Sequence, residues 1–107
     1  MNQRRVVVTG LGSVSPFGLG VEALWSGIKA GQSAIKPITL FDVSEFPVRF
    51  AGEVANYNPL DHFEKRKLRH LDRVTQFALL AADEAAKDSG IDLDACDRTR
   101  IGTIVGS

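Results

Sequence analysis

The sequence predicts an α/β fold in which a buried parallel sheet packs against amphipathic helices. Two apolar runs, Arg5–Thr9 and Arg100–Gly106, are rich in β-branched residues and lack the polar alternation of a strand with one solvated face. Both are therefore predicted to be strands buried on both faces. Between them, residues 71–85 carry the clearest helical stripe of apolar residues. With 107 residues, the chain has the length of one small domain.

Apolar residues with helical spacing predict a short amphipathic helix that begins near Val21 and ends before Gly31. The stripe consists of Val21, Leu24, Trp25 and Ile28. Its large aromatic residue, Trp25, is expected to lie in the core. Residues 31–54 contain two prolines and alternating apolar residues, which predict a loop followed by a short extended or hairpin segment.

The second half of the chain begins with a predicted short helix at Asn58-Pro59. Asparagine suits the N-cap and proline the first turn of a helix, and a basic run follows at residues 65–70. The long helix comes next and ends at Ser89-Gly90, where glycine suits a left-handed cap. Its apolar stripe consists of Leu71, Val74, Phe77, Ala78, Ala81, Ala82 and Ala85. The alanines of this stripe indicate close packing against a sheet or another helix.

The predicted elements do not form a closed core by themselves. Two buried strands and two or three one-sided helices cannot cover each other, because a parallel sheet needs helices on both faces. The chain also stops at the end of an apolar run, whereas a chain terminus is usually polar and frayed. We therefore expect the 107 residues to be part of a larger protein that contains more of the sheet.

The composition limits the classes of protein to which the chain can belong. Thirteen basic and thirteen acidic residues cancel, so no overall field favours nucleic acid or an anionic membrane. The three valines after Arg4 and Arg5 are too few for a signal-peptide core or a membrane span. The single cysteine, Cys96, cannot form an internal disulfide or a CxxC motif. These features predict a cytoplasmic globular protein that binds neither nucleic acid nor a membrane.

The glycine-rich turn after the first predicted strand raises the question of a nucleotide site. A dinucleotide-binding loop needs G-x-G-x-x-G, with a helix N-terminus facing the pyrophosphate. In GLGSVSPFGLG, Ser15 takes the third glycine position, Pro16 follows it, and the helical stripe starts only near Val21. No carboxylate follows at the end of a second strand, and no Walker A sequence occurs. We therefore interpret the loop as a structural turn whose glycines permit positive φ and close packing, and we expect no cofactor.

Taken together, these residues resemble the N-terminal part of the β-ketoacyl-[acyl-carrier-protein] synthases. The resemblance rests on RRVVVTGLGSVSPFG, VEALWSGIKAGQSAI, FDVSEFPVRFAGEV and DRVTQFALLAADEAAKDSGIDL, with RIGTIVGS at the end. It covers essentially the whole chain, and TLFDVSEFPVRFAGEV is more similar to synthase II, the elongation enzyme, than to synthase I. The resemblance implies a thiolase-like α/β fold, of which this chain would be the N-terminal part of the first α/β half.

The resemblance also implies a reaction, the decarboxylative Claisen condensation of acyl and malonyl groups borne by acyl carrier protein. In such enzymes a cysteine thiolate takes the acyl chain, two histidines support decarboxylation and stabilise the oxyanion, and a lysine organises the site. Cys96 does not match this nucleophile, because it lies among acidic residues in a polar connector. His62 and His70 are eight residues apart, too far for a helical metal pair. We therefore expect no catalytic residue and no metal site in this chain.

The basic run EKRKLRH is the strongest functional signal of the sequence. Five basic residues lie within six positions of an otherwise neutral chain: Lys65, Arg66, Lys67, Arg69 and His70. A local patch of this kind can steer an acidic partner. The resemblance implies that Lys65, Arg66 and Arg69 dock the acidic acyl carrier protein.

A purely structural interpretation of the basic run stands beside this one. The cations of the run would then pair with Asp61, Glu64 and Asp72 on a solvated face. Asp72 and Arg73 are expected to anchor the preceding turn through ion pairs, with Asp72 near the positive end of the long helix. RNA binding is less favoured, because only Phe63 interleaves with the charges.

The sequence thus predicts a partial N-terminal thiolase-like domain, residues 1–107, of a fatty-acid-elongating condensing enzyme. The complete enzyme is expected to be a homodimer with acyl carrier protein as its partner, and this chain alone is expected to be inactive. Two alternatives are a type II polyketide ketosynthase, which differs in its substrates, and a non-catalytic α/β fragment that only docks a carrier protein. A nucleotide-dependent oxidoreductase is the least favoured, because the glycine loop lacks the fingerprint.

Overall fold

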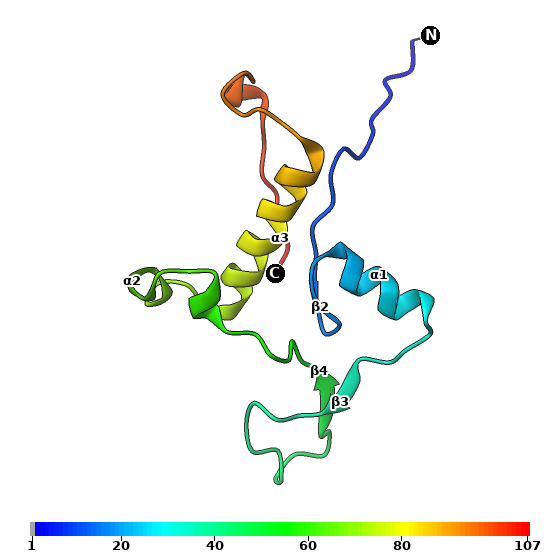
Figure 1. The fold of residues 1–107 in the computed structure, drawn as a ribbon, viewed down its shortest axis with the longest axis vertical. Helices are drawn as coiled ribbons and strands as arrows, with labels where there is room; N and C mark the ends of the chain where they lie inside the picture. Colours follow the sequence, from blue (N-terminus) through cyan, green and yellow to red (C-terminus); the bar gives the residue numbers. More distant parts are fainter. Residues whose placement is uncertain (1) are drawn as a thin grey trace.

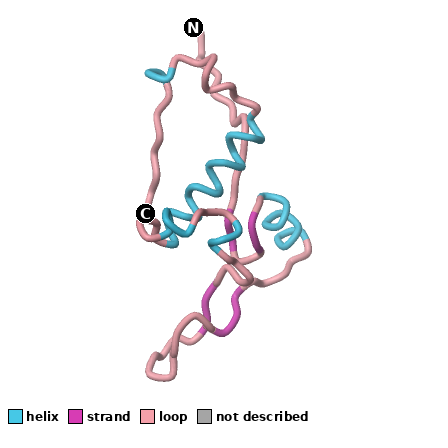
Figure 2. The backbone as a smooth tube through the Cα atoms, turned by 60° about the vertical axis from the view of Figure 1, so that its left-hand side comes forward, coloured by secondary structure: helices cyan, strands magenta, loops and turns pink. Residues whose placement is uncertain are grey.

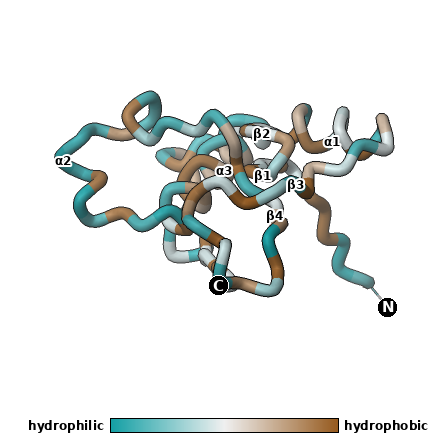
Figure 3. Tube along the Cα trace, turned by 90° about the horizontal axis from the view of Figure 1, so that it is seen from below, coloured by the Kyte–Doolittle hydropathy of each residue, from teal (hydrophilic) through white to brown (hydrophobic). Residues whose placement is uncertain are grey.

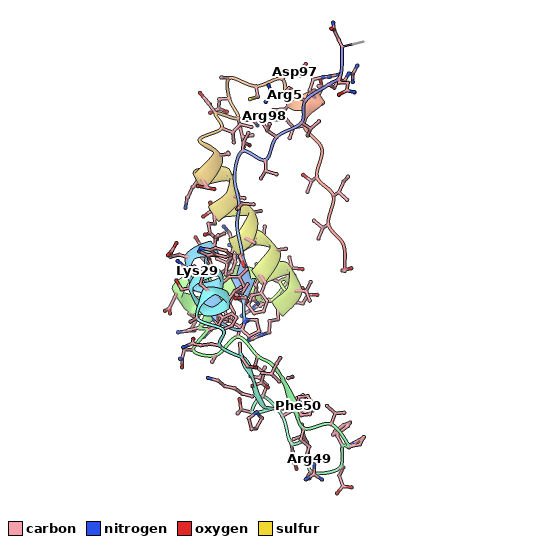
Figure 4. All side chains as sticks on the ribbon, turned by 90° about the vertical axis from the view of Figure 1, so that its right-hand side faces the viewer. Arg5, Lys29, Arg49, Phe50, Asp97 and Arg98 are labelled. Carbon is pink, nitrogen blue, oxygen red and sulfur yellow. The ribbon has the colours of Figure 1, made fainter. Side chains whose placement is uncertain are left out.

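In the computed structural model, which describes residues 2–107, the helices and strands are spread along an elongated molecule (Figure 1). Its principal axes measure 58 × 39 × 22 Å and its radius of gyration is 17.6 Å. A compact domain of this length has a radius of gyration of about 13 Å. Figure 4 shows Arg49 and Phe50 at one end of the molecule and Arg5, Asp97 and Arg98 at the other. The chain therefore does not close around a single centre.

The described residues form two small hairpins, two longer helices and several short helical turns. In chain order these elements are β1 (Val14–Ser15), β2 (Gly18–Leu19), α1 (Val21–Lys29), β3 (Ile35–Pro37), β4 (Phe50–Gly52), η1 (Pro59–Asp61), α2 (Lys65–Leu68), α3 (Arg73–Ser89) and η2 (Arg98–Arg100), where η marks a 3-10 helix. β1 pairs antiparallel with β2, and β3 pairs antiparallel with β4 (Figure 2). The two pairs belong to separate sheets. The extended segment predicted after the loop of residues 31–54 is confirmed as β4, but its partner β3 lies before the loop, and the β1–β2 hairpin was not predicted.

The first predicted helix is confirmed as α1, and it ends at a left-handed glycine. Gly31 has φ 65°, and its N–H donates to the carbonyl of Ile28 at 3.0 Å. Gly27 is buried because the ring of Phe17 packs directly against it. The expectation of a core position for Trp25 is wrong for this chain, since its side chain is 54% exposed. No element among the described residues covers that face of α1.

The long predicted helix is confirmed as α3, with a side-chain cap at its start and a glycine cap at its end. The carboxylate of Asp72 accepts a hydrogen bond from the N–H of Thr75 at 2.8 Å. Hydrogen bonds from Thr75 lower the pKa of Asp72, so the cap is ionised at neutral pH. Gly90 closes the helix with φ 66°, in the left-handed region. Within residues 2–107, neither α3 nor any other helix is long and apolar enough to cross a membrane.

The glycine-rich loop lies directly against the backbone of α3. A side chain at Gly10 would collide with the carbonyl oxygen of Ala85, and one at Gly12 would collide with that of Ala81. These two glycines therefore allow close packing, as predicted. The positive φ values occur later in the loop, at Gly18 (134°) and Gly20 (98°), where the chain turns from β1 into β2 and then into α1.

The two strands predicted at the ends of the chain are not formed. Arg5–Thr9 and the residues after Arg100 have no strand partner among the described residues, and Arg100 itself ends η2. The Val6 and Ile104 side chains are 93% and 99% exposed. A strand exists only by pairing with a neighbour, so an apolar run without that neighbour stays an unpaired segment.

We predict that the isolated 107-residue chain unfolds without a cooperative thermal transition. Among residues 2–107 no hydrophobic side chain is buried, so little apolar surface is exposed all at once on heating. Differential scanning calorimetry of the purified chain should show a broad, shallow slope. A sharp heat-absorption peak that is independent of chain concentration would contradict the prediction.

Candidate functional site

The basic run forms one exposed segment that projects from the start of α3. Lys65–Leu68 form α2, and Arg69 follows as its C-cap in the helical conformation. All five basic side chains of residues 65–70 are exposed. Figure 1 shows α2 on the other side of α3 from α1, and Figure 3 shows it as a hydrophilic, outlying part of the molecule. We call residues 65–70 the basic segment.

The helical conformation of the basic segment brings the three predicted docking residues together. In a helix, residues three and four apart are neighbours on one face. Arg66 and Arg69 are three apart, and Lys65 and Arg69 are four apart. The side chains of Lys65, Arg66 and Arg69 therefore present one positively charged face to solvent.

Neighbouring carboxylates do not neutralise this face. The ion pairs recorded within residues 2–107 are Lys87 with Asp83 and Arg98 with Asp94, all of them exposed. Asp61 instead lies within hydrogen-bond distance of the Asn58 amide, at 3.4 Å, and Asp72 caps α3 through Thr75. The structural interpretation of the basic run required its cations to pair with Asp61, Glu64 and Asp72. None of these ion pairs is formed in the part of the chain that the structure describes.

Local hydrogen bonds form the two short helices η1 and α2, of which the second belongs to the basic segment. The side chain of Asn58 accepts a hydrogen bond from the N–H of Leu60 at 3.1 Å, which confirms the predicted cap and starts η1. The carbonyl of Glu64 accepts from the N–H groups of Lys67 and Leu68, which forms α2. Where the segment meets α3 there is an open, mainly apolar hollow of about 330 Å³. It is lined by Phe63, Lys67, His70, Leu71 and Leu79.

A cluster of aromatic rings and one cation joins Tyr57, which precedes the basic segment, to α3. The guanidinium of Arg73 lies 5.2 Å from the ring centre of Tyr57 and 5.0 Å from that of Phe77. Arg73 also donates to the carbonyl of Val54 at 3.0 Å. The ion pair expected for Arg73 is therefore replaced by cation–π contacts and a backbone hydrogen bond. Burial raises the pKa of Tyr57, against the opposing effect of the Arg73 charge, so its hydroxyl keeps its proton at neutral pH.

An open hollow of about 600 Å³ lies between the glycine-rich loop and α3, and two of its carboxylates, Glu84 and Asp88, accept hydrogen bonds from backbone groups. Glu84 accepts from the N–H of Val21 at 2.9 Å and from that of Ser13 at 3.0 Å. Asp88 accepts from the N–H of Leu11 at 2.9 Å. The loop amides that would face a phosphate in a nucleotide site thus point at carboxylates of α3. This arrangement favours the interpretation of the loop as a structural turn.

The cysteine and the histidines lie apart from any cluster of metal-binding groups. Cys96 is half-buried, in the turn before η2. The exposed His62 ring stacks on the Tyr57 ring with 5.9 Å between their centres, and His70 is exposed in the basic segment. The described residues contain no group of three or more histidine, cysteine or acidic side chains arranged to hold a metal ion.

Comparisons with known proteins assign the chain to a sequence family. A family model described as "Beta-ketoacyl synthase, N-terminal domain" matches residues 3–107. The 3-oxoacyl-[acyl-carrier-protein] synthase 2 of Coxiella burnetii is 42% identical over 107 residues, which is all of this chain and 26% of that protein. The granaticin polyketide putative beta-ketoacyl synthase 1 of Streptomyces violaceoruber is 43% identical over 104 residues, or 97% of this chain and 25% of that protein.

A solved structure supports the same relationship at the level of the fold. The structure titled "The ishigamide ketosynthase/chain length factor" matches with a TM-score of 0.75 and 39% sequence identity. The match covers 87% of this chain and 23% of that one. The chain thus spans about a quarter of the length of the curated relatives that it matches.

Proposed function

The chain belongs to the β-ketoacyl synthase family, and from this premise we propose that it is the N-terminal part of a condensing enzyme of fatty acid elongation. The predicted fold class, α/β and thiolase-like, is confirmed by the family match and by the similarity to a solved ketosynthase. We propose that residues 1–107 form part of the N-terminal domain of this enzyme. The observation that carries the proposal is 42% identity to a 3-oxoacyl-[acyl-carrier-protein] synthase 2 over the whole chain.

The proposed reaction joins an acyl thioester to a malonyl thioester. A cysteine of the complete enzyme accepts the acyl group, and the first carrier leaves with a free thiol. Malonyl carrier protein then loses CO2, and the resulting carbanion attacks the acyl thioester, expelling the cysteine thiolate and giving a 3-oxoacyl thioester. This chain is proposed to contribute no catalytic residue, since Cys96, His62 and His70 lie in separate turns that flank short helices.

The contribution of this chain to the reaction is proposed to be the docking of the carrier. Lys65, Arg66 and Arg69 present an exposed positive face without an ion-pair partner among residues 2–107. Such a face attracts an acidic carrier protein and orients its approach. Lys67 extends the same charge toward the apolar hollow beside α3, which His70 also lines.

The complete enzyme is further proposed to be a homodimer that works in the cytoplasm. The large unpartnered apolar surface of this chain supports a role inside a larger assembly, because isolated proteins seldom leave such surface exposed. The equal numbers of acidic and basic residues support a protein without affinity for nucleic acid or anionic membranes.

A type II polyketide ketosynthase is the second candidate, because the granaticin relative is as similar to this chain as the fatty acid enzyme is. The two enzymes share the condensation and differ in the chains that they accept. Mass spectrometry of the carrier-bound product distinguishes them. One two-carbon extension of a saturated acyl chain supports fatty acid elongation, whereas repeated condensation without reduction supports the polyketide candidate.

We predict that the natural protein containing this segment has an intact mass of about four times the 11.6 kDa of the chain. This expectation follows because the chain covers 26% of its Coxiella burnetii relative. The purified protein should release CO2 from malonyl-loaded carrier protein when carrier protein loaded with an acyl group is also present. An intact mass of 11.6 kDa would mean that the protein lacks the catalytic cysteine. The condensing activity would then be refuted, and carrier docking would be the remaining function.

We predict that reversing the charge of Arg66 and Arg69 weakens carrier binding by the complete enzyme. The double variant Arg66→Glu, Arg69→Glu should raise the Kd for acyl carrier protein at least about tenfold at low salt, because repulsion replaces attraction at the docking face. Isothermal titration at two salt concentrations measures the effect.

A matched control separates local charge from net charge. Lys29→Glu with Lys36→Glu makes the same change in net charge at exposed lysines of α1 and β3. This control should leave the Kd nearly unchanged. Equal Kd values for the docking variant and the native protein would refute the docking proposal.

A further inference from the structure

The motif D-R-x-x-Q-F at the start of α3 contains a buried side-chain amide, and both its oxygen and its NH2 group form hydrogen bonds. Gln76 is one of the few buried polar residues of the described chain, with 8% of its surface exposed. Its carbonyl oxygen accepts a hydrogen bond from the hydroxyl of Tyr57 at 2.7 Å. Its NH2 group donates to the carbonyl of Leu71 at 2.9 Å. The side chain therefore bridges two points of the backbone path that are fourteen residues apart.

These two points bracket the basic segment. Tyr57 immediately precedes the Asn58 cap, and Leu71 immediately follows His70. Residues 57–71, which we call the excursion, contact α3 at both of their ends, and the basic segment between these ends projects away from the helix. From this arrangement we propose that Gln76 is a positioning residue, which ties both ends of the excursion to α3 and so holds the basic segment in its docking geometry. This inference rests on the proposed carrier docking.

The bridge has one stable orientation. The carbonyl of Leu71 can only accept a hydrogen bond, so the NH2 end of Gln76 must face it. The oxygen end then faces Tyr57, whose protonated hydroxyl donates to it. Arg73 supports the same end of the excursion by holding the carbonyl of Val54 and by stacking on the Tyr57 ring. The hydrogen bond to Tyr57 thus holds the distant end of residues 57–71 against α3, and the one to Leu71 fixes the residue at which the chain enters α3.

The basic segment needs such a tie because its own helix is short. α2 has four residues, and a single helical turn is not stable in water without tertiary contacts. Loss of the tie leaves the segment folded against α3 for only part of the time. A partner that binds only the folded arrangement then binds more weakly, in proportion to the fraction of molecules that have it.

The test compares carrier-borne and carrier-free substrates of the complete enzyme. Gln76→Leu should raise the KM for acyl carrier protein about tenfold, with kcat at saturation unchanged. The same acyl group on free phosphopantetheine never contacts the basic segment, so its kcat/KM should stay at the native value. Tyr57→Phe removes only the hydroxyl and keeps the ring contacts, so it should give a smaller rise in KM, about threefold. Gln32→Leu, at an exposed glutamine after α1, is the matched control and should change neither value.

The outcomes separate this inference from the docking proposal. If the Arg66→Glu, Arg69→Glu variant raises the KM for the carrier but Gln76→Leu and Tyr57→Phe leave it unchanged, the tie has no positioning role. If none of these variants changes the KM, docking at the basic segment fails and the inference fails with it. An equal loss of kcat/KM for carrier-borne and carrier-free thioesters in Tyr57→Phe would show a general structural role and would also overturn the inference.

Discussion

The packing of the glycine-rich loop on α3 is the contact on which the arrangement of the described chain depends. Glu84 accepts the amide hydrogens of Ser13 and Val21 with its two oxygens, so one carboxylate fixes both the loop and the first residue of α1. This works only because Gly10 and Gly12 let the loop backbone touch the helix backbone. A carboxylate that satisfies the first amide of α1 also complements the positive end of that helix. The orientation of α1 against α3 is thus set by hydrogen bonds rather than by a shared apolar core.

The same kind of interaction organises the rest of the molecule. Glu53 accepts hydrogen bonds from the Thr39 hydroxyl and from the amides of Thr39 and Leu40, which fixes the start of the long loop between β3 and β4. The hydrogen bond from the Thr39 side chain is the main cause of the lowered pKa of Glu53. Gln76 likewise holds residues 57–71 against α3 through its hydrogen bonds with Tyr57 and Leu71. Because no hydrophobic side chain is buried among residues 2–107, each of these polar side chains carries more of the local structure than it would in a dense core.

What the sequence could predict is what depends on neighbours along the chain. The helices α1 and α3, the glycine cap at the end of α3 and the Asn58 cap depend on local signals, and all of them are confirmed, whereas the side-chain cap made by Asp72 was not predicted. The strand at Arg5–Thr9 failed because pairing depends on a partner elsewhere in the sequence, and none is present in residues 2–107. The basic segment was found from its charges, and its exposed helical face agrees with that expectation. The bridge made by Gln76 was not found, because a polar residue between Thr75 and Phe77 gives no sign that its amide is buried or which carbonyl it reaches.

A chain without net charge can still direct an acidic partner, because charge acts over a limited distance. At physiological salt the field of an exposed charge decays over about 8 Å, so a partner responds to the charges nearest its path and not to the total. The basic segment projects from α3 on the side away from α1 (Figure 1), whereas Asp83, which pairs with Lys87, lies further along that helix. Its charges therefore act as a local patch within a neutral whole. The orientation of that patch depends on how residues 57–71 are held against α3, so in the proposed docking the buried amide at Gln76 and the exposed cations at Arg66 and Arg69 act together.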